Sequence, residues 1–210
     1  MLELLLVVLA SQVPGGAEPS PATQSPPPNI VLMYVDDMGW GDLPSQGART
    51  WTMPNLDQLE QDGTRFTQFY VAQPVCSASR AALLTGCYPN RLGIHGALAP
   101  RNDHGIHDDE TTLAELLKAQ GYATGIFGKW HLGWQEQFLP PNHGFDEYLG
   151  IPYSNDMWPG HPVSPKAWPP LPLIDGVETV QGITKLEQQE PLTRRFTERA
   201  VNFIDRHAEG

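Results

Sequence analysis

A continuous apolar run near the beginning of the chain constrains the fold most. Residues 30–35 read IVLMYV, a run that is rich in β-forming side chains and has no polar alternation. This pattern is typical of a strand buried on both faces, as in a parallel sheet that helices cover on each side. The run therefore predicts that the chain builds an α/β domain.

The rest of the chain alternates between helix and strand patterns, as an α/β domain with a mainly parallel sheet requires. The predicted elements are strands at residues 30–35, 64–71 and 122–127, helices at residues 52–60 (capped by Gly63), 77–86, 111–120 and 192–207, and a hairpin at residues 171–180 that turns at Asp175-Gly176. The helix at residues 111–120 carries Leu113, Leu116 and Leu117 on one face. The proline-rich residues 158–172 suit an irregular segment.

The charge of the chain limits its partners. The 210 residues contain 13 Lys and Arg against 24 Asp and Glu, which gives a net charge of −11. Such a surface argues against a nucleic-acid or anionic-membrane partner. We therefore expect no nucleic acid among the partners.

The N-terminus resembles a secretory signal peptide. Residues 1–17 hold a short apolar run and a small-residue cleavage site, although the positively charged start of such peptides is absent. The alternative is a disordered apolar tail. We expect residues 18–28 to form a Pro/Ser-rich linker, residues 29–210 to form the folded domain, and no segment to span a membrane.

Two adjacent carboxylates, Asp36 and Asp37, directly follow the first predicted strand. Adjacent carboxylates repel each other unless a cation lies between them, and their oxygens suit a hard metal such as Ca²⁺ or Mg²⁺. In α/β sheets the ligand site lies beyond the carboxyl ends of the strands. The pair is therefore a candidate metal site, with a solvent-exposed turn as the alternative.

Cys76 lies just before the helix at residues 77–86, where backbone N–H groups and the helix dipole favour an anion. Arg80 follows one turn later and could hold sulfate or phosphate with its planar fork. The alternatives are a small buried thiol and a surface arginine. A Cys76–Cys87 disulfide conflicts with the helix, which would separate the two cysteines by roughly 16 Å, whereas a disulfide needs Cα atoms within about 7 Å.

Lys129 and His131 follow the third predicted strand, and alternation along an extended segment would point both to one side. Together they offer a positive charge and a proton donor, although two exposed residues are the alternative. The remaining histidines show no metal-like spacing and receive no role: His95, His104, His107, His143, His161 and His207.

Three motifs in this order resemble the type I sulfatase family, in particular arylsulfatases and N-acetylgalactosamine-6-sulfatases. They are DDMGWGDL from Asp36, CSASRAALLTG from Cys76 and GKWHLG from Gly128. The resemblance implies an alkaline-phosphatase-like α/β/α sandwich, of which this chain is the N-terminal portion. It also implies hydrolysis of sulfate esters, with small molecules, glycolipids or glycans as substrates, in the lysosome or outside the cell.

The resemblance assigns a role to each candidate residue. Cys76 corresponds to the cysteine that a formylglycine-generating enzyme oxidises to the nucleophile, which also ligates Ca²⁺. Asp36 and Asp37 would be further Ca²⁺ ligands. Lys129 and Ser154 would bind the sulfate, Arg80 would hold the nucleophile, and His131 would take a proton from it.

The chain departs from the family pattern in two respects that matter for activity. The modification motif carries Ala78 where the family has proline, and Cys87 stands where relatives usually have arginine. Family members are about twice as long, and their later metal ligands have no counterpart here, so we expect the chain to be inactive by itself. The alternatives are a non-catalytic truncated secreted product and a phosphatase or phosphodiesterase of the same superfold.

Overall fold

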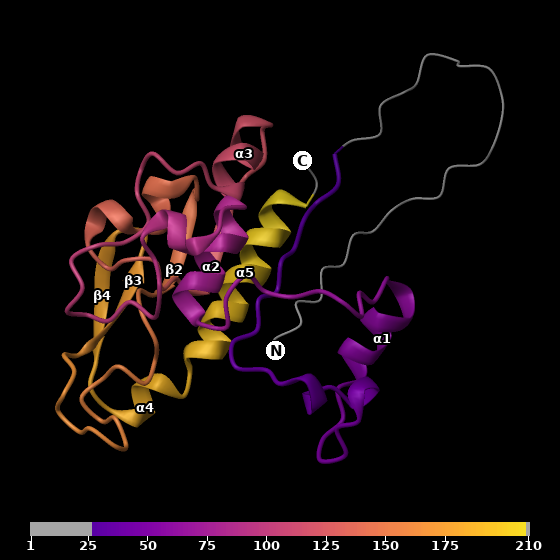
Figure 1. Cartoon of the computed structure of the whole chain (residues 1–210), viewed down its shortest axis with the longest axis horizontal. Helices are drawn as coiled ribbons and strands as arrows, with labels where there is room; N and C mark the ends of the chain where they lie inside the picture. Colours follow the sequence, from indigo (N-terminus) through magenta and orange to yellow (C-terminus); the bar gives the residue numbers. More distant parts are fainter. Residues whose placement is uncertain (1–26, 209–210) are drawn as a thin grey trace. The chain divides into compact units, whose positions relative to one another are not determined.

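The computed structural model describes residues 27–208, and these fall into two compact units divided after Val71 (Figure 1). The proposed signal peptide at residues 1–17 and most of the proposed linker lie outside the described residues. No helix among the described residues is long and apolar enough to cross a bilayer.

The first unit, described over residues 27–71, contains α1 (Pro54–Asp62) and two short 3-10 helices, Trp40–Asp42 and Pro44–Gln46. The helix α1 has Pro54 at its first position and ends at Gly63, as predicted. The predicted strands at residues 30–35 and 64–71 are both wrong, because neither segment pairs with another strand in the structure. A strand needs a hydrogen-bonded neighbour, and an apolar run by itself does not supply one.

The second unit contains a four-stranded sheet in the order β1-β2-β3-β4. Its strands are β1 (Gly125–Lys129), β2 (Glu147–Ile151), β3 (Leu171–Asp175) and β4 (Glu178–Ile183). The β1–β2 pair is parallel, whereas β2–β3 and β3–β4 are antiparallel. The predicted hairpin is confirmed, and Gly176 (φ 63°) supplies the left-handed residue of its two-residue turn.

The helices of the second unit are α2 (Cys76–Thr85), α3 (Leu113–Ala119), α4 (Leu186–Gln189) and α5 (Leu192–His207). Thr112 caps α3, since its hydroxyl accepts from Glu115 N at 3.2 Å while Glu115 Oε2 accepts from Thr112 N at 2.6 Å. The predicted apolar face of α3 is wrong in detail. Ala114 is buried, whereas Leu113 and Leu116 are exposed.

Two hydrophobic clusters lie on opposite faces of this sheet. One contains Tyr148 of β2 and Ile174 of β3 with residues of α2 and α3. The other contains the alternate strand residues Leu149 and Leu173 with residues of α5. Because successive strand residues point to opposite faces, the sheet has helices on both sides, which confirms the predicted α/β/α layering.

A glycine in β2 allows β1 and β2 to approach closely. Gly128 and Gly150 are paired across the two strands. A Cβ added at Gly150 would collide with the carbonyl oxygen of Gly128 and with the ring of Tyr148. This crowding requires glycine at position 150, just before the segment that carries the candidate site.

Candidate functional site

Cys76 is the first residue of α2 and is half-buried. The preceding residue, Val75, has no side chain that can cap the helix, so the first turn has no side-chain cap from it. The N-terminus of a ten-residue helix therefore lies next to the thiol, where its amide groups and dipole favour a negative charge.

The two cysteines are both free. They flank opposite ends of α2, since Gly86 caps the helix in a left-handed conformation and Cys87 follows it. The Cys87 amide donates to Thr85 Oγ1 at 3.2 Å. The expectation that the two thiols do not pair is confirmed, and the helix between them is the reason.

Arg80 connects α2 to the carboxyl end of β1. Its Nη1 donates to the backbone oxygen of Lys129 at 2.6 Å. Lys129 is the last residue of β1, so this bond brings the first turns of α2 next to the end of the strand. The guanidinium of Arg80 and the backbone of Lys129 are therefore neighbours.

His131 is fully buried, and its Nε2 lies 2.7 Å from the backbone oxygen of Leu98. The amide of Leu98 in turn donates to Ser77 Oγ at 3.0 Å. Leu98 therefore joins His131 to the second residue of α2. Sequence reasoning missed Leu98 and Ser77, because backbone atoms and a single serine leave no motif.

Ser154 follows the end of β2 and is half-buried. The segment after β1 runs alongside the segment after β2, since Trp130 N donates to Ile151 O at 2.9 Å and His131 N donates to Pro152 O at 3.2 Å. Ser154 thus lies two residues beyond a direct neighbour of His131. The strand β2 was absent from the predicted elements, although the residues 148–151, YLGI, carry a short apolar signal.

Asp36 is half-buried and Asp37 is exposed, and both belong to the first unit. Asp37 has a left-handed backbone (φ 56°). An extended chain would send two adjacent carboxylates to opposite sides, and a left-handed residue breaks that alternation. The donor atoms are carboxylate oxygens, which fit Ca²⁺.

Two of the predicted site residues have an uncommon backbone. Asp37, His131 (φ 63°) and Lys166 (φ 64°) are the positive-φ residues other than glycine in the described part of the chain. Asp and His tolerate this region better than most side chains, and such residues cluster at functional sites. Asp37 lies two residues beyond the segment predicted as a strand at residues 30–35, and His131 lies two residues beyond the end of β1.

Tyr148 of β2 lies within the electrostatic reach of Arg80 and was not predicted as part of the site. Its side chain is 1% exposed, and no hydrogen-bond partner of its hydroxyl is present in the described structure. Burial raises the pKa of Tyr148 far above its usual value, whereas the positive charge of Arg80 opposes that shift. The hydroxyl therefore stays protonated beside the guanidinium.

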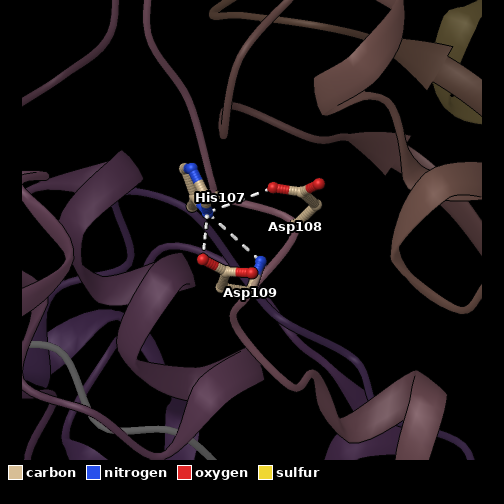
Figure 2. A group of neighbouring side chains, drawn as sticks. All are labelled: His107, Asp108 and Asp109. Atoms are coloured by element: carbon tan, nitrogen blue, oxygen red, sulfur yellow. Dashed lines mark hydrogen bonds and ion pairs between the residues drawn. The ribbon is translucent and has the colours of Figure 1, made fainter.

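A second polar group lies in the loop that precedes α3. His107, Asp108 and Asp109 lie next to one another in a loop, with His107 Nδ1 at 3.1 Å from Asp108 Oδ1 (Figure 2). All three side chains are largely exposed. Exposed acidic groups of this kind are common without an ion, so we assign no function to them.

Known proteins resemble this chain in sequence. The family model described as Sulfatase matches residues 28–210. Arylsulfatase A of Bos taurus is 53% identical over 154 residues, which cover 72% of this chain and 30% of that protein. N-acetylgalactosamine-6-sulfatase of Mus musculus is 41% identical over 216 aligned residues, which cover 96% of this chain and 40% of that protein.

Solved structures resemble it as well. The PsFucS1 sulfatase from Pseudoalteromonas sp. has a TM-score of 0.71 at 28% identity, over 83% of this chain and 40% of that one. Ps i-CgsB has a TM-score of 0.66 at 31% identity, over 81% of this chain and 40% of that one. The chain thus spans 30% to 40% of the length of the relatives named here. On the match of the family model to nearly its whole length, the chain belongs to the sulfatase family.

Proposed function

We propose that this chain carries the nucleophile half of a site that hydrolyses sulfate esters. The observation that carries the proposal is the hydrogen bond from Arg80 Nη1 to Lys129 O, because it brings the start of α2 next to the end of β1. Two cationic side chains and a helix N-terminus suit a sulfate group. Membership of the sulfatase family supports the same reaction class.

Formylglycine at position 76 would supply a nucleophile that a cysteine or serine cannot. Oxidation replaces the Cβ–S bond with a C=O bond, the sulfur leaves as hydrogen sulfide, and an oxidant of the modifying enzyme accepts the two electrons. The aldehyde adds water to form a geminal diol. One hydroxyl would attack the sulfur atom of the ester, and its proton would pass to the departing alcohol. The second hydroxyl would then lose its proton as the C–O bond to sulfate breaks and the aldehyde re-forms.

His131 is the group we propose to accept that second proton. A backbone carbonyl can only accept, so the 2.7 Å contact to Leu98 O requires the hydrogen on Nε2 of His131. The neutral ring then has its basic lone pair on Nδ1. The contact therefore holds the imidazole in one tautomer, which suits a general base.

Arg80 and Lys129 would neutralise the sulfate, and Ser154 would help to position it. The backbone oxygen of Lys129 orients Arg80, because it accepts from one end of the guanidinium. Asp36 and Asp37 would each offer carboxylate oxygens to Ca²⁺. The chemistry that the ion would supply is to offset negative charge and to favour ionisation of a hydroxyl group.

We expect the 210 residues by themselves to bind Ca²⁺ weakly and to show no turnover. Ca²⁺ takes roughly six to eight oxygen ligands. Among the described residues His107, Asp108 and Asp109 form the one group of three candidate ligands, so Asp36 and Asp37 do not belong to such a group. Calorimetric titration of the chain with Ca²⁺ measures this expectation directly, and a Kd in the micromolar range would contradict it.

The proposed modification of Cys76 would have to precede folding. In the folded chain residues 77–79 are buried inside the first turn of α2, where no enzyme can read them as an extended segment. We therefore propose a route through the secretory pathway, where the formylglycine-generating enzyme meets the unfolded chain, to the lysosome or the cell exterior. The departure at Ala78 is expected to lower the extent of conversion.

Mass spectrometry of the tryptic peptide ending at Arg80 tests the nucleophile. The chain is expressed with the formylglycine-generating enzyme, next to the variants Cys76→Ser and Ala78→Pro. We expect an aldehyde-bearing peptide from the wild type, none from Cys76→Ser and more from Ala78→Pro. Proline favours the extended backbone that the modifying enzyme would read, and it is also tolerated in the first turn of the folded helix. An unmodified thiol in both the wild type and Ala78→Pro would sink the proposed nucleophile.

A further inference from the structure

Asn102 closes a tight turn in the loop that contacts His131. Its backbone N–H donates to Ala99 O at 2.9 Å, and Pro100 occupies the second position of this β-turn, where its fixed φ is favoured. The side chain of Asn102 turns back onto the same residue, since its Oδ1 accepts from Ala99 N at 2.6 Å. One asparagine therefore binds both backbone polar groups of Ala99.

The peptide between Leu98 and Ala99 links this asparagine to the candidate site. The oxygen of the peptide lies 2.7 Å from His131 Nε2, and its N–H is the group that donates to Asn102 Oδ1. A trans peptide is planar, so its oxygen and its N–H lie in one plane and point to opposite sides of the chain. By binding the N–H, Asn102 therefore fixes the direction in which the oxygen points toward His131.

The contact with Asn102 also strengthens the acceptor that His131 meets. A peptide whose N–H is hydrogen-bonded is polarised, and its carbonyl oxygen then accepts more strongly. Both Ala99 and His131 are buried, so water is not at hand to replace either partner. Without the oxygen of Asn102 the Ala99 N–H would be unpaired in a buried position, which favours rotation of the peptide away from His131.

Backbone groups of the same loop attach it to the segment that follows β1. Asn102 O accepts from Trp134 Nε1 at 3.2 Å and from Gln135 Nε2 at 3.0 Å. Ile106 N donates to Leu132 O at 2.8 Å. These three hydrogen bonds do not use the side chain of Asn102. A substitution of that side chain therefore leaves the loop attached and changes mainly the peptide that the side chain binds.

We propose that Asn102 is a positioning residue for His131. By binding the Ala99 N–H, it directs the Leu98 oxygen at Nε2 of His131 and keeps the hydrogen of the neutral ring on that nitrogen. The lone pair that accepts a proton is then kept on Nδ1. The inference rests on the proposed function in one respect, because the role of His131 as a base belongs to that function. Asn102 acts through the peptide that it binds and not through the substrate.

Nitrogen-15 NMR of the His131 ring in the full chain measures the tautomer, because protonated and unprotonated ring nitrogens have different chemical shifts. The signals are assigned by their loss in His131→Gln and recorded at a pH at which the ring is neutral. We expect the hydrogen on Nε2 in the wild type. Asn102→Leu and Asn102→Ala both remove the acceptor, and each should lower the ratio of the Nε2–H to the Nδ1–H tautomer about fivefold to tenfold. Asn102→Asp keeps an acceptor oxygen and should retain the wild-type ratio.

Asn142→Leu is the matched control and should keep the wild-type ratio, since Asn142 Nδ2 also donates to a backbone oxygen of the second unit, that of Glu136, at 2.7 Å. The wild-type ratio in a folded Asn102→Leu or Asn102→Ala protein, or a lowered ratio in Asn102→Asp, would overturn the inference and leave the proposed base in place. A wild type with its hydrogen on Nδ1 would overturn both. If Cys76 stays unmodified while loss of the Asn102 acceptor still lowers the ratio, the proposed nucleophile fails and the assignment of Asn102 stands.

Discussion

The two units of this chain contain similar apolar segments but differ in how they use them. In the described part of the first unit, residues 27–71, no side chain is fully buried, and Ile30, Val31 and Met33 are each more than half exposed. In the second unit two clusters of buried side chains cover the two faces of a sheet. Burial therefore follows strand pairing here and not local apolar content.

Gly150→Ala gives the sharpest test of that contrast and the largest expected effect. The new Cβ would collide with the carbonyl oxygen of Gly128, which cannot move without breaking the β1–β2 pairing. We expect the free energy of unfolding to fall by about 4 kcal/mol or more. The control is Gly41→Ala in the first unit, where an added Cβ meets nothing within 4 Å.

Urea denaturation followed by circular dichroism measures both variants. Equal small effects of Gly150→Ala and Gly41→Ala would show that the close approach of the two strands is not needed. In that case both units would tolerate an added Cβ equally well, and the contrast between them would disappear.

A pair of Leu→Ala substitutions compares the packing of the two units directly. Leu173 in β3 is fully buried, whereas Leu56 in α1 is half-buried. We expect Leu173→Ala to cost about 3 kcal/mol, since it leaves a cavity, and Leu56→Ala to cost about 1 kcal/mol or less. Hydrogen exchange resolved by segment gives the two values, and a cost at Leu56 equal to that at Leu173 would contradict the contrast.

The stability of the folded second unit should depend on pH through one of its buried histidines. His143 is fully buried and stacks on Trp130 with ring centroids 6.1 Å apart. Burial lowers the pKa of His143, although the nearby Glu115 opposes that shift. The unfolded chain then binds a proton that the folded chain does not, so stability is present above the ordinary pKa of histidine and is lost as the pH falls toward the folded pKa.

The variant His143→Phe should remove this dependence. Between about pH 7 and pH 5 we expect the wild type to lose up to about 1.4 kcal/mol per pH unit relative to His143→Phe. The lowered pKa of Asp146, which has its hydrogen-bond partners in Lys118 and Thr124, acts in a more acidic window and is common to both proteins. Parallel pH profiles of the two proteins would show that His143 does not contribute.

The smallest expected effect concerns a surface ion pair across the second unit. Arg199 of α5 contacts Asp175 at the end of β3, with Nη2 at 2.7 Å from Oδ2. The two side chains are 35% and 40% exposed, so solvent screens them. We expect Arg199→Ala to cost about 0.5–1 kcal/mol in thermal denaturation, against no measurable change for Arg194→Ala, whose ion pair within α5 is more exposed.

Helices were predictable because their signals are local. Pro54 and Gly63 mark the ends of α1, and the predicted range of α5, residues 192–207, is the observed one. Strand partners are distant in sequence, and this explains the errors. The residues 30–35 look more like a strand than YLGI does, yet only the latter segment lies beside β1 and forms β2.

The sequence by itself determined the family motifs, the acidic charge and the position of Cys76 at a helix start, because each depends on neighbouring residues. Only the tertiary structure decided that Arg80 donates to Lys129 O, that Leu98 joins His131 to Ser77, and that Trp134 donates to Asn102 O. The hydrogen bonds among these contacts join residues that are 21 to 49 positions apart in the sequence, and no local pattern encodes them. They exist because sheet pairing and burial bring the ends of β1 and β2 to the first turns of α2.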